Sequence, residues 1–151
     1  LQKEDDLLLD KNGSVTLGDF KVRAYKATVA NNSVVGNDAK SSIKVTMNVS
    51  LTYTGSGLNV DTLGNVFSME LADDSLKDKV LKQTSNGVIA GANIPTMNSA
   101  KNYTLNFETK NAEQYKSYNN GKNLQLKVKL FSQTAIFNLA ADGSILSVGR
   151  A

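Results

Sequence analysis

The side chains that could do acid–base or metal chemistry are few, because this sequence contains no histidine, no cysteine and no tryptophan. Histidine is the commonest general base and the commonest ligand of transition metals. Without these residues, Ser-His-Asp and Cys-His nucleophilic sites, imidazole zinc sites and thiolate metal sites are impossible. Carboxylate, lysine and tyrosine chemistry are what remain.

Paired carboxylates are the first pattern to consider, since two acids at the right separation can hydrolyse a glycosidic bond. The glutamates away from the N-terminus are Glu70, Glu108 and Glu113. Glu70 and Glu108 occupy polar positions of expected strands, and no tryptophan is present to form a sugar platform. We therefore expect these side chains to lie on a solvated sheet face, and we expect no catalytic residues.

Acidic loops are the second pattern, because residues 10–13 (DKNG) resemble the start of a calcium-binding loop. The further oxygen ligands and the distal bidentate glutamate of an EF-hand do not follow at the required spacing. Aspartate and asparagine in such places usually satisfy backbone donors in turns. We expect no metal and no cofactor, and a carboxylate- or calcium-dependent enzyme is the less favoured alternative. The other acidic candidates are Asp5, Asp6, Asp73, Asp74 and Asp142.

Basic side chains are candidates for binding, since the net charge is +3. The lysines are scattered, whereas nucleic-acid binders usually cluster their lysines and arginines, so we expect no specific nucleic-acid partner. If their strands are neighbours, one cationic face is formed by Lys21, Arg23, Lys44, Lys127 and Lys129. The alternative is a solvated sheet whose lysines discourage edge-to-edge aggregation.

Two tyrosines, Tyr115 and Tyr118, stand three residues apart in the segment 111–118, whose composition favours a short helix. Their rings could form a small ligand platform. The alternative, which we expect, is a role in the core or in a tyrosine corner.

The elements that must position these residues are β-strands. Residues 43–53 alternate apolar and polar side chains without a break, which predicts a long strand with one dry and one wet face. Such a strand is typical of an antiparallel sheet. Further strands are expected near 15–17 and over 20–29, 66–71, 87–94, 103–107, 124–130, 135–139 and 145–148. Residues 76–82 are expected to make one or two helical turns, and Asp142-Gly143 predicts a hairpin turn.

The same alternation predicts which side chains are buried. The expected core comprises Val45, Met47, Val49, Leu51, Leu105, Phe107, Leu126, Val128 and Phe137. The expected exposed positions are Lys44, Thr46, Lys127 and Lys129.

A chain of 151 residues fits one domain. About eight strands with short turns and one or two short helical turns predict an all-β, two-sheet antiparallel sandwich over residues 14–151. Residues 1–13 are expected to be a flexible segment or an edge strand. No run of about 20 apolar residues occurs, so we expect no membrane span. The chain starts at Leu1 rather than at methionine, so we expect a fragment or a processed form.

The order of these features resembles the immunoglobulin-like extracytoplasmic domains of Gram-positive lipoproteins and secreted antigens of unknown function. The resemblance is carried by GDFKVRAYKA (18–27), IKVTMNVSLTY (43–53) and KNYTLNFET (101–109), within roughly residues 14–140. The family often has a Pro-Gly turn before its later strand, whereas Pro95 here is not followed by glycine.

The resemblance implies an exported bacterial module that is not an enzyme and that binds a protein or a cell-surface polymer. Contact with the membrane is then expected only through an anchor outside this chain. The alternative is a subunit of a larger extracellular assembly, such as a pilus, a phage tail or a secretion apparatus.

Overall fold

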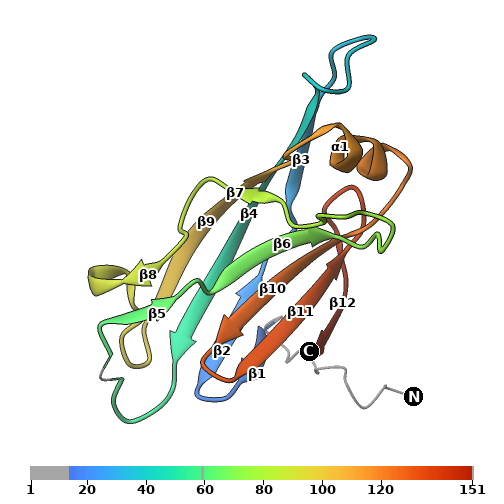
Figure 1. Cartoon of the computed structure of the whole chain (residues 1–151). Coiled ribbons are helices and arrows are strands. Elements are labelled where there is room, and N and C mark those ends of the chain that lie inside the picture. Colours follow the sequence, from blue (N-terminus) through green and yellow to red (C-terminus); the bar gives the residue numbers. More distant parts are fainter. Residues whose placement is uncertain (1–13, 59, 151) are drawn as a thin grey trace, which may run out of the picture.

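The computed structural model describes residues 14–58 and 60–150, and Figure 1 traces them in chain order. The expectations for residues 1–13, including the turn at 10–13, lie outside this described part. Within it, two main antiparallel sheets face each other across one hydrophobic core, in an open, sandwich-like arrangement that does not close into a barrel. No helix in the described ranges is both long and apolar enough to cross a bilayer.

The larger sheet is built around one long strand, β4, whose unbroken alternation puts every second side chain into the core. Its strand order is β1-β2-β4-β9-β7, and β3 pairs with the first half of β4 while β2 pairs with the second half. The six strands are β1 (Ser14–Leu17), β2 (Phe20–Ala24), β3 (Thr28–Asn32), β4 (Ser42–Tyr53), β7 (Lys82–Gln83) and β9 (Ala100–Glu108).

The strand expected over 20–29 is interrupted between β2 and β3. The Tyr25 N–H still donates to the Asn48 carbonyl of β4 at 3.0 Å. The Ala27 N–H instead donates to the Gly143 carbonyl at 2.9 Å, so it bonds to the smaller sheet's last turn rather than to β4. The interruption therefore ties the two sheets together at this side.

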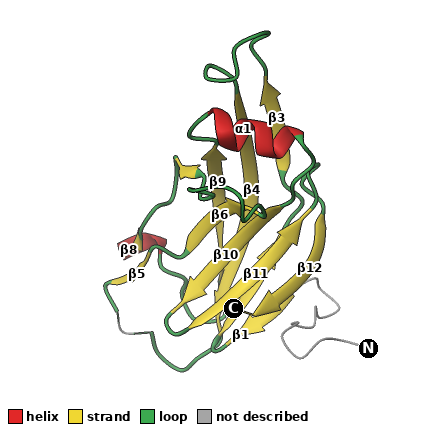
Figure 2. Ribbon diagram, turned by 45° about the vertical axis from the view of Figure 1, so that its right-hand side comes forward, coloured by secondary structure: helices red, strands yellow, loops and turns green. Residues whose placement is uncertain are grey.

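The smaller sheet has the order β12-β11-β10-β6, and a separate pair, β5-β8, lies beside it. The strands are β5 (Thr62–Gly64), β6 (Phe67–Leu71), β8 (Ile89–Ala90), β10 (Leu124–Leu130), β11 (Gln133–Leu139) and β12 (Ile145–Arg150). A 3-10 turn, η1 (Gly91–Asn93), follows β8, and the helix α1 (Ala112–Asn119) lies across one end of the sheets (Figure 2). The described part thus has twelve strands rather than about eight, because the strand expected over 20–29 is divided into β2 and β3 and the short strands β5 and β7 were not predicted. The strand expected over 87–94 is reduced to β8, since the chain then turns into η1.

The predicted core is confirmed, since all nine expected residues are at most 1% exposed. Lys44, Thr46 and Lys129 are exposed as expected. Lys127 is only half-exposed, because its ammonium group folds back onto Glu70 at 3.2 Å. All four strands predicted from strict alternation are present.

The helical turns expected over 76–82 are wrong. The Leu81 N–H donates to the Met69 carbonyl at 2.9 Å, and the Leu71 N–H donates to the Lys79 carbonyl at 2.9 Å. This segment therefore pairs with the open edge of β6, and its continuation β7 pairs with the edge of β9. The extended conformation is favoured over a helix here because it forms hydrogen bonds with the free backbone N–H and C=O groups at the edges of both sheets, and because it buries Leu81.

The helix α1 confirms the prediction for 111–118. Asn111 caps it by accepting the Gln114 N–H at 2.9 Å. The buried Gln114 side chain donates to the carbonyls of Asp78 and Val80, so it ties the helix to the segment before β7.

Candidate functional site

The predicted cationic residues do not form one face. Lys21 and Arg23 on β2 and Lys44 on β4 lie on the outer side of the larger sheet, whereas β10, which carries Lys127 and Lys129, belongs to the smaller sheet across the core. These two groups therefore face opposite sides of the molecule.

Even on the larger sheet the positive charges are separated. Arg23 pairs with Ser50, six residues along β4 from Lys44, which is about 20 Å in an extended strand. The Arg23 guanidinium instead lies over the ring of Tyr25, 4.9 Å from its centre.

The two predicted tyrosines hold α1 in place and do not form a platform. Tyr115 is buried in the core, and its hydroxyl donates to the Asn31 side chain of β3 at 3.0 Å. The hydroxyl of Tyr118 donates to the Ala141 carbonyl in the turn before β12, and burial raises its pKa. Both rings therefore have the structural role that was the expected alternative.

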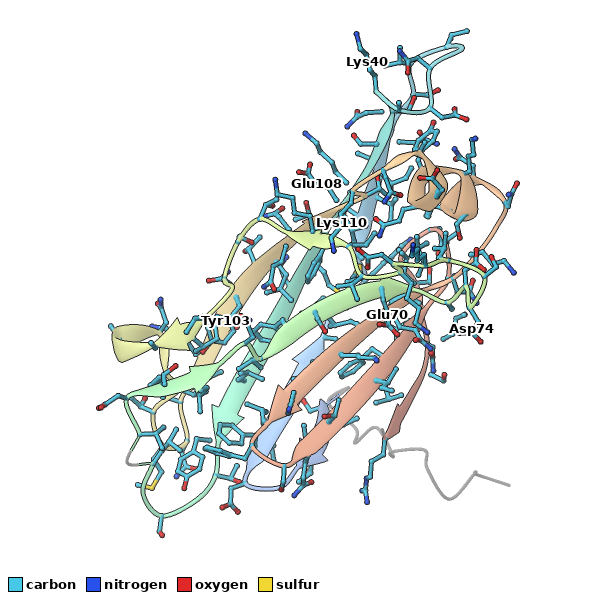
Figure 3. All side chains as sticks on the ribbon, in the orientation of Figure 1. Lys40, Glu70, Asp74, Tyr103, Glu108 and Lys110 are labelled. Carbon is cyan, nitrogen blue, oxygen red and sulfur yellow. The ribbon has the colours of Figure 1, made fainter. Side chains whose placement is uncertain are left out.

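The predicted carboxylates are also apart, as Figure 3 shows for Glu70 and Glu108. Glu70 lies on β6 and pairs with Lys127, and Glu108 lies on β9 and pairs with Lys82 at 3.9 Å. Glu113 is in the first turn of α1. Among the described residues, no three acidic side chains come close enough together to share a metal ion.

Asp73 shows what the acidic turns do in this fold. The Ser117 hydroxyl of α1 and the Ser75 hydroxyl each donate to its carboxylate at 2.6 Å. These hydrogen bonds, the one from Ser117 first, lower the pKa of Asp73 to about 2. The group is thus a charged anchor for the helix, and Asp74 beside it pairs with Lys79 at 3.1 Å.

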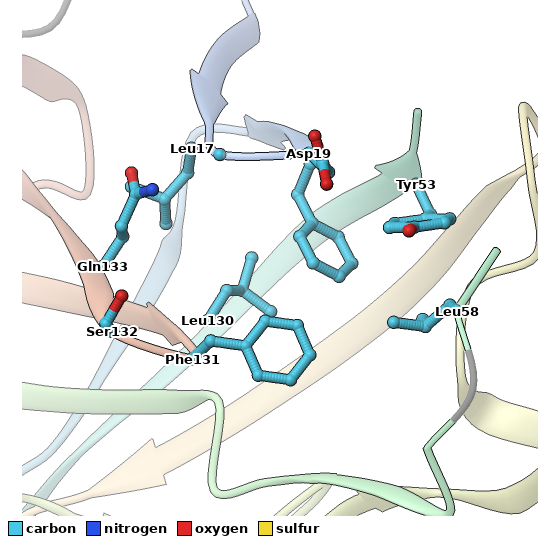
Figure 4. A pocket seen from close by; sticks show the side chains of 10 residues that line it. Leu17, Asp19, Tyr53, Leu58, Leu130, Phe131, Ser132 and Gln133 are labelled. Carbon is cyan, nitrogen blue, oxygen red and sulfur yellow. The ribbon is translucent and has the colours of Figure 1, made fainter. Parts of the chain in front are cut away.

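The β1–β2 turn, the β10–β11 turn and the chain after β4 lie at the end of the sandwich opposite α1 (Figure 1), and a hollow lies between them (Figure 4). It has a volume of about 340 Å³. In Figure 4 the rings of Tyr53 and Phe131 and the side chain of Leu58 point into one space. Its lining comprises Leu17, Gly18, Asp19, Phe20, Tyr53, Leu58, Leu130, Phe131, Ser132 and Gln133.

Phe131 is the unusual residue of this hollow. It is the first residue of the two-residue turn between Leu130 and Gln133, and its φ is 56°. Positive φ at the first turn residue alone is the pattern of a type II′ turn, which normally takes glycine there. A bulky side chain in this conformation is a strained outlier. The ring is nevertheless 56% exposed.

The aromatic rings continue inward from Phe131. Its ring centre lies 6.1 Å from that of Phe20, which lies 5.2 Å from that of Tyr53, both in tilted arrangements. Phe20 and Tyr53 are buried. The two inner rings therefore form a firm floor beneath the exposed one.

Two further hollows adjoin this one and share its residues. Tyr53 and Leu58 also line a hollow of about 340 Å³ together with Met97. Phe131 also lines a hollow of about 440 Å³ together with Lys129. We call the three together the end cleft.

Sequence reasoning missed the end cleft. The available signal was the pair Phe131-Ser132, which links two alternating strands without any of the turn formers glycine, asparagine or aspartate. The other residues converge on the cleft from four separate parts of the chain, which no local pattern indicates.

Comparison of the chain with protein family models, with curated proteins and with solved structures gave no match.

Proposed function

We propose that the protein is an exported, immunoglobulin-like binding module that recognises an apolar segment of a partner protein in the end cleft. The observation that carries this proposal is Phe131, an exposed aromatic ring held on a strained backbone. Strained residues persist only where the surrounding structure holds them, and they cluster at functional sites. Glycine would fit this turn better, so the ring itself is the reason to keep phenylalanine.

The surroundings of Phe131 support the same function. Met97 and Val60 are also exposed at the end cleft, at 57% and 39%. Exposed apolar side chains that lie together commonly mark an interaction site. Aromatic residues and methionine are the types enriched at protein interfaces. Loops at the ends of a sandwich are also the usual place for recognition.

The shape of the cleft favours a polypeptide ligand. Each hollow is at the lower end of the size range of small-molecule pockets. Their row along the end of the sandwich instead suits successive side chains of an extended segment. Among the described residues that line the three hollows, only Asp19 is a carboxylate, which supports recognition rather than acid–base catalysis.

A displayed library of random twelve-residue peptides tests the proposal. We expect the selected peptides to share a large aliphatic or aromatic residue. In fluorescence anisotropy, Phe131→Gly should weaken their binding about tenfold or more, as expected for a central aromatic contact. The matched control is Leu146→Ala, which removes a similarly exposed side chain, 59% exposed, from β12. Peptides that bind both variants equally well, or no selected peptides at all, would contradict the proposal.

Export is supported by the family resemblance of residues 18–27, 43–53 and 101–109. Fractionation of the native host cells, with detection by an antibody against this chain, tests it. Recovery outside the cytoplasmic fraction is expected, and recovery with cytoplasmic enzymes would contradict it.

A second candidate, a subunit of an extracellular assembly, is favoured by the edge of β3. In the described part of the chain, β3 pairs only with β4, and Thr28–Asn32 contains no charged residue. Such an uncharged edge can accept another strand. Sedimentation velocity tests this candidate: concentration-dependent association that Ala30→Lys abolishes would favour it, and a monomer at all concentrations would exclude self-assembly through β3.

A further inference from the structure

We propose that the partner segment carries an acidic side chain close to its apolar anchor, and that Lys129 recognises this acid. The inference rests on the proposed function, because it describes the ligand of the same end cleft. It also reduces the five basic candidates from the sequence to one.

Lys129 connects the end cleft to a further hollow. It lines the 440 Å³ hollow with Phe131, and it lines a hollow of about 470 Å³ with Lys127 on the outer side of the smaller sheet. Asn65 lines both hollows. The end cleft therefore continues into a groove that changes from aromatic to basic.

Within the described part of the chain, one of the two positive charges along this groove has no carboxylate partner. Lys127 pairs with Glu70 at 3.2 Å, whereas Lys129 makes no ion pair in the described ranges of the chain. No carboxylate is among the described residues that line either of the two hollows at Lys129. An acidic group of the partner is the charge that complements this groove.

Apolar residues adjoin Lys129, since the same groove is lined by Val66, Phe67, Val80 and Leu81. Lys129 itself is exposed, so its attraction to an acidic group of the partner depends on the salt concentration. The backbone is also fixed, because the Lys129 N–H donates to the Val66 carbonyl at 2.8 Å.

The spacing of the two ligand groups follows from the strand. Lys129 is the penultimate residue of β10 and Phe131 is the first residue of the turn that follows, so their Cα atoms are at most about 7 Å apart. An extended ligand rises by about 3.3 Å per residue. The acidic residue should therefore stand about two or three residues from the apolar anchor.

The same displayed library tests this inference with two charge variants. The wild-type protein should enrich Asp or Glu about two or three residues from the apolar anchor. Lys129→Glu should lose this enrichment and favour Lys or Arg at that place. Lys21→Glu, on the opposite sheet, makes the same change of net charge and should select the same peptides as the wild-type protein.

Binding constants of one selected acidic peptide complete the test. Lys129→Glu should weaken its binding by about tenfold at low salt, and added salt should narrow the difference from the wild-type protein. Lys21→Glu should change binding less than about twofold. Peptides without an acidic preference, or equal effects of the two variants, would overturn the inference.

Failure of the inference differs from failure of the proposed function. If peptides depend on Phe131 but show no acidic preference, only the role of Lys129 is refuted. If binding does not depend on Phe131, or no peptide is selected, the proposed function fails and the inference fails with it.

Discussion

The conformation of Phe131 leads to a stability prediction with an unusual sign: Phe131→Gly should be more stable than Phe131→Ala. Both substitutions remove the ring and its contact with Phe20, so the comparison isolates the backbone. At most positions the glycine variant is the less stable by about 0.4–1 kcal/mol, because glycine gives the unfolded chain more freedom. Here φ is 56°, where a residue with a Cβ atom is strained.

The magnitude follows from two opposing terms. Placing an ordinary residue in the left-handed region costs about 1–2 kcal/mol, and glycine avoids this cost. Subtracting the entropic advantage of alanine, about 0.4–1 kcal/mol, leaves the glycine variant more stable by up to about 1.6 kcal/mol. For a chain of this size, 1 kcal/mol corresponds to about 2–4 °C in melting temperature.

The assay is urea unfolding followed by far-ultraviolet circular dichroism, since the chain has no tryptophan to report on its core. The matched control is the neighbouring turn residue Ser132, whose φ is not positive. There the alanine variant should be the more stable of the pair. If Phe131→Ala equals or exceeds Phe131→Gly, the turn is not strained by its side chain. Strain at Phe131 would then no longer support a binding function at the end cleft.

Three further predictions concern the framework. Leu126→Ala should destabilise the fold by about 2–5 kcal/mol, because the Leu126 side chain is fully buried. In the same urea measurement, the control variant Lys129→Ala should cost less than about 0.5 kcal/mol, because Lys129 is exposed. Gly143→Ala should cost about 1–3 kcal/mol more than Gly121→Ala. Both glycines have φ near 90°, but only at Gly143 would the new Cβ meet the Ala27 carbonyl oxygen, at 2.2 Å, so equal losses would refute the contact. The wild-type protein should lose stability as the pH falls from about 4 to about 2, because the Asp73 pKa is lowered from 3.8 to about 2 and the unfolded chain takes up the proton first. Urea unfolding across this range should show a flatter pH dependence for Asp73→Asn, and an unchanged slope would mean that Asp73 is not the group responsible.

The sequence predicted best where burial alone decides the structure. Residues 43–53, 103–107, 124–130 and 135–139 alternate because one side of each strand faces the core, so the pattern and the structure have the same cause. The segment 76–82 has no such pattern. Its structure depends on the free edges of β6 and β9, which exist only once the two sheets have formed.

The candidate site was harder to predict for a related reason. Alternation tells that Lys44 and Lys127 point away from the core, but it does not tell which sheet each strand joins. Strand order is a property of the whole fold, and here it puts these lysines on opposite sides. Phe131 was not predicted as a site residue because what distinguishes it is a positive φ angle. A phenylalanine in a sequence does not indicate positive φ, since bulky residues rarely adopt it.

The hydrogen bonds of the two outer sheet faces explain why recognition is better placed at the end of the molecule. On the larger sheet, the Thr46 hydroxyl donates to the Asn106 side chain and the Thr104 hydroxyl donates to the Asn48 side chain, both at 2.9 Å. On the smaller sheet, the amide of Gln125 donates to Asn138 in the same way.

A ligand on either face would have to replace these internal hydrogen bonds before it gained its own, and net gains from such exchanges are small. At Phe131 in the end cleft, a ligand would not have to replace internal hydrogen bonds, because the exposed ring loses only its contact with water on binding. The apolar cleft is therefore the place where a partner would gain most free energy per contact. Lys129 beside it, which makes no ion pair with the described residues, is the place where charge would select among partners.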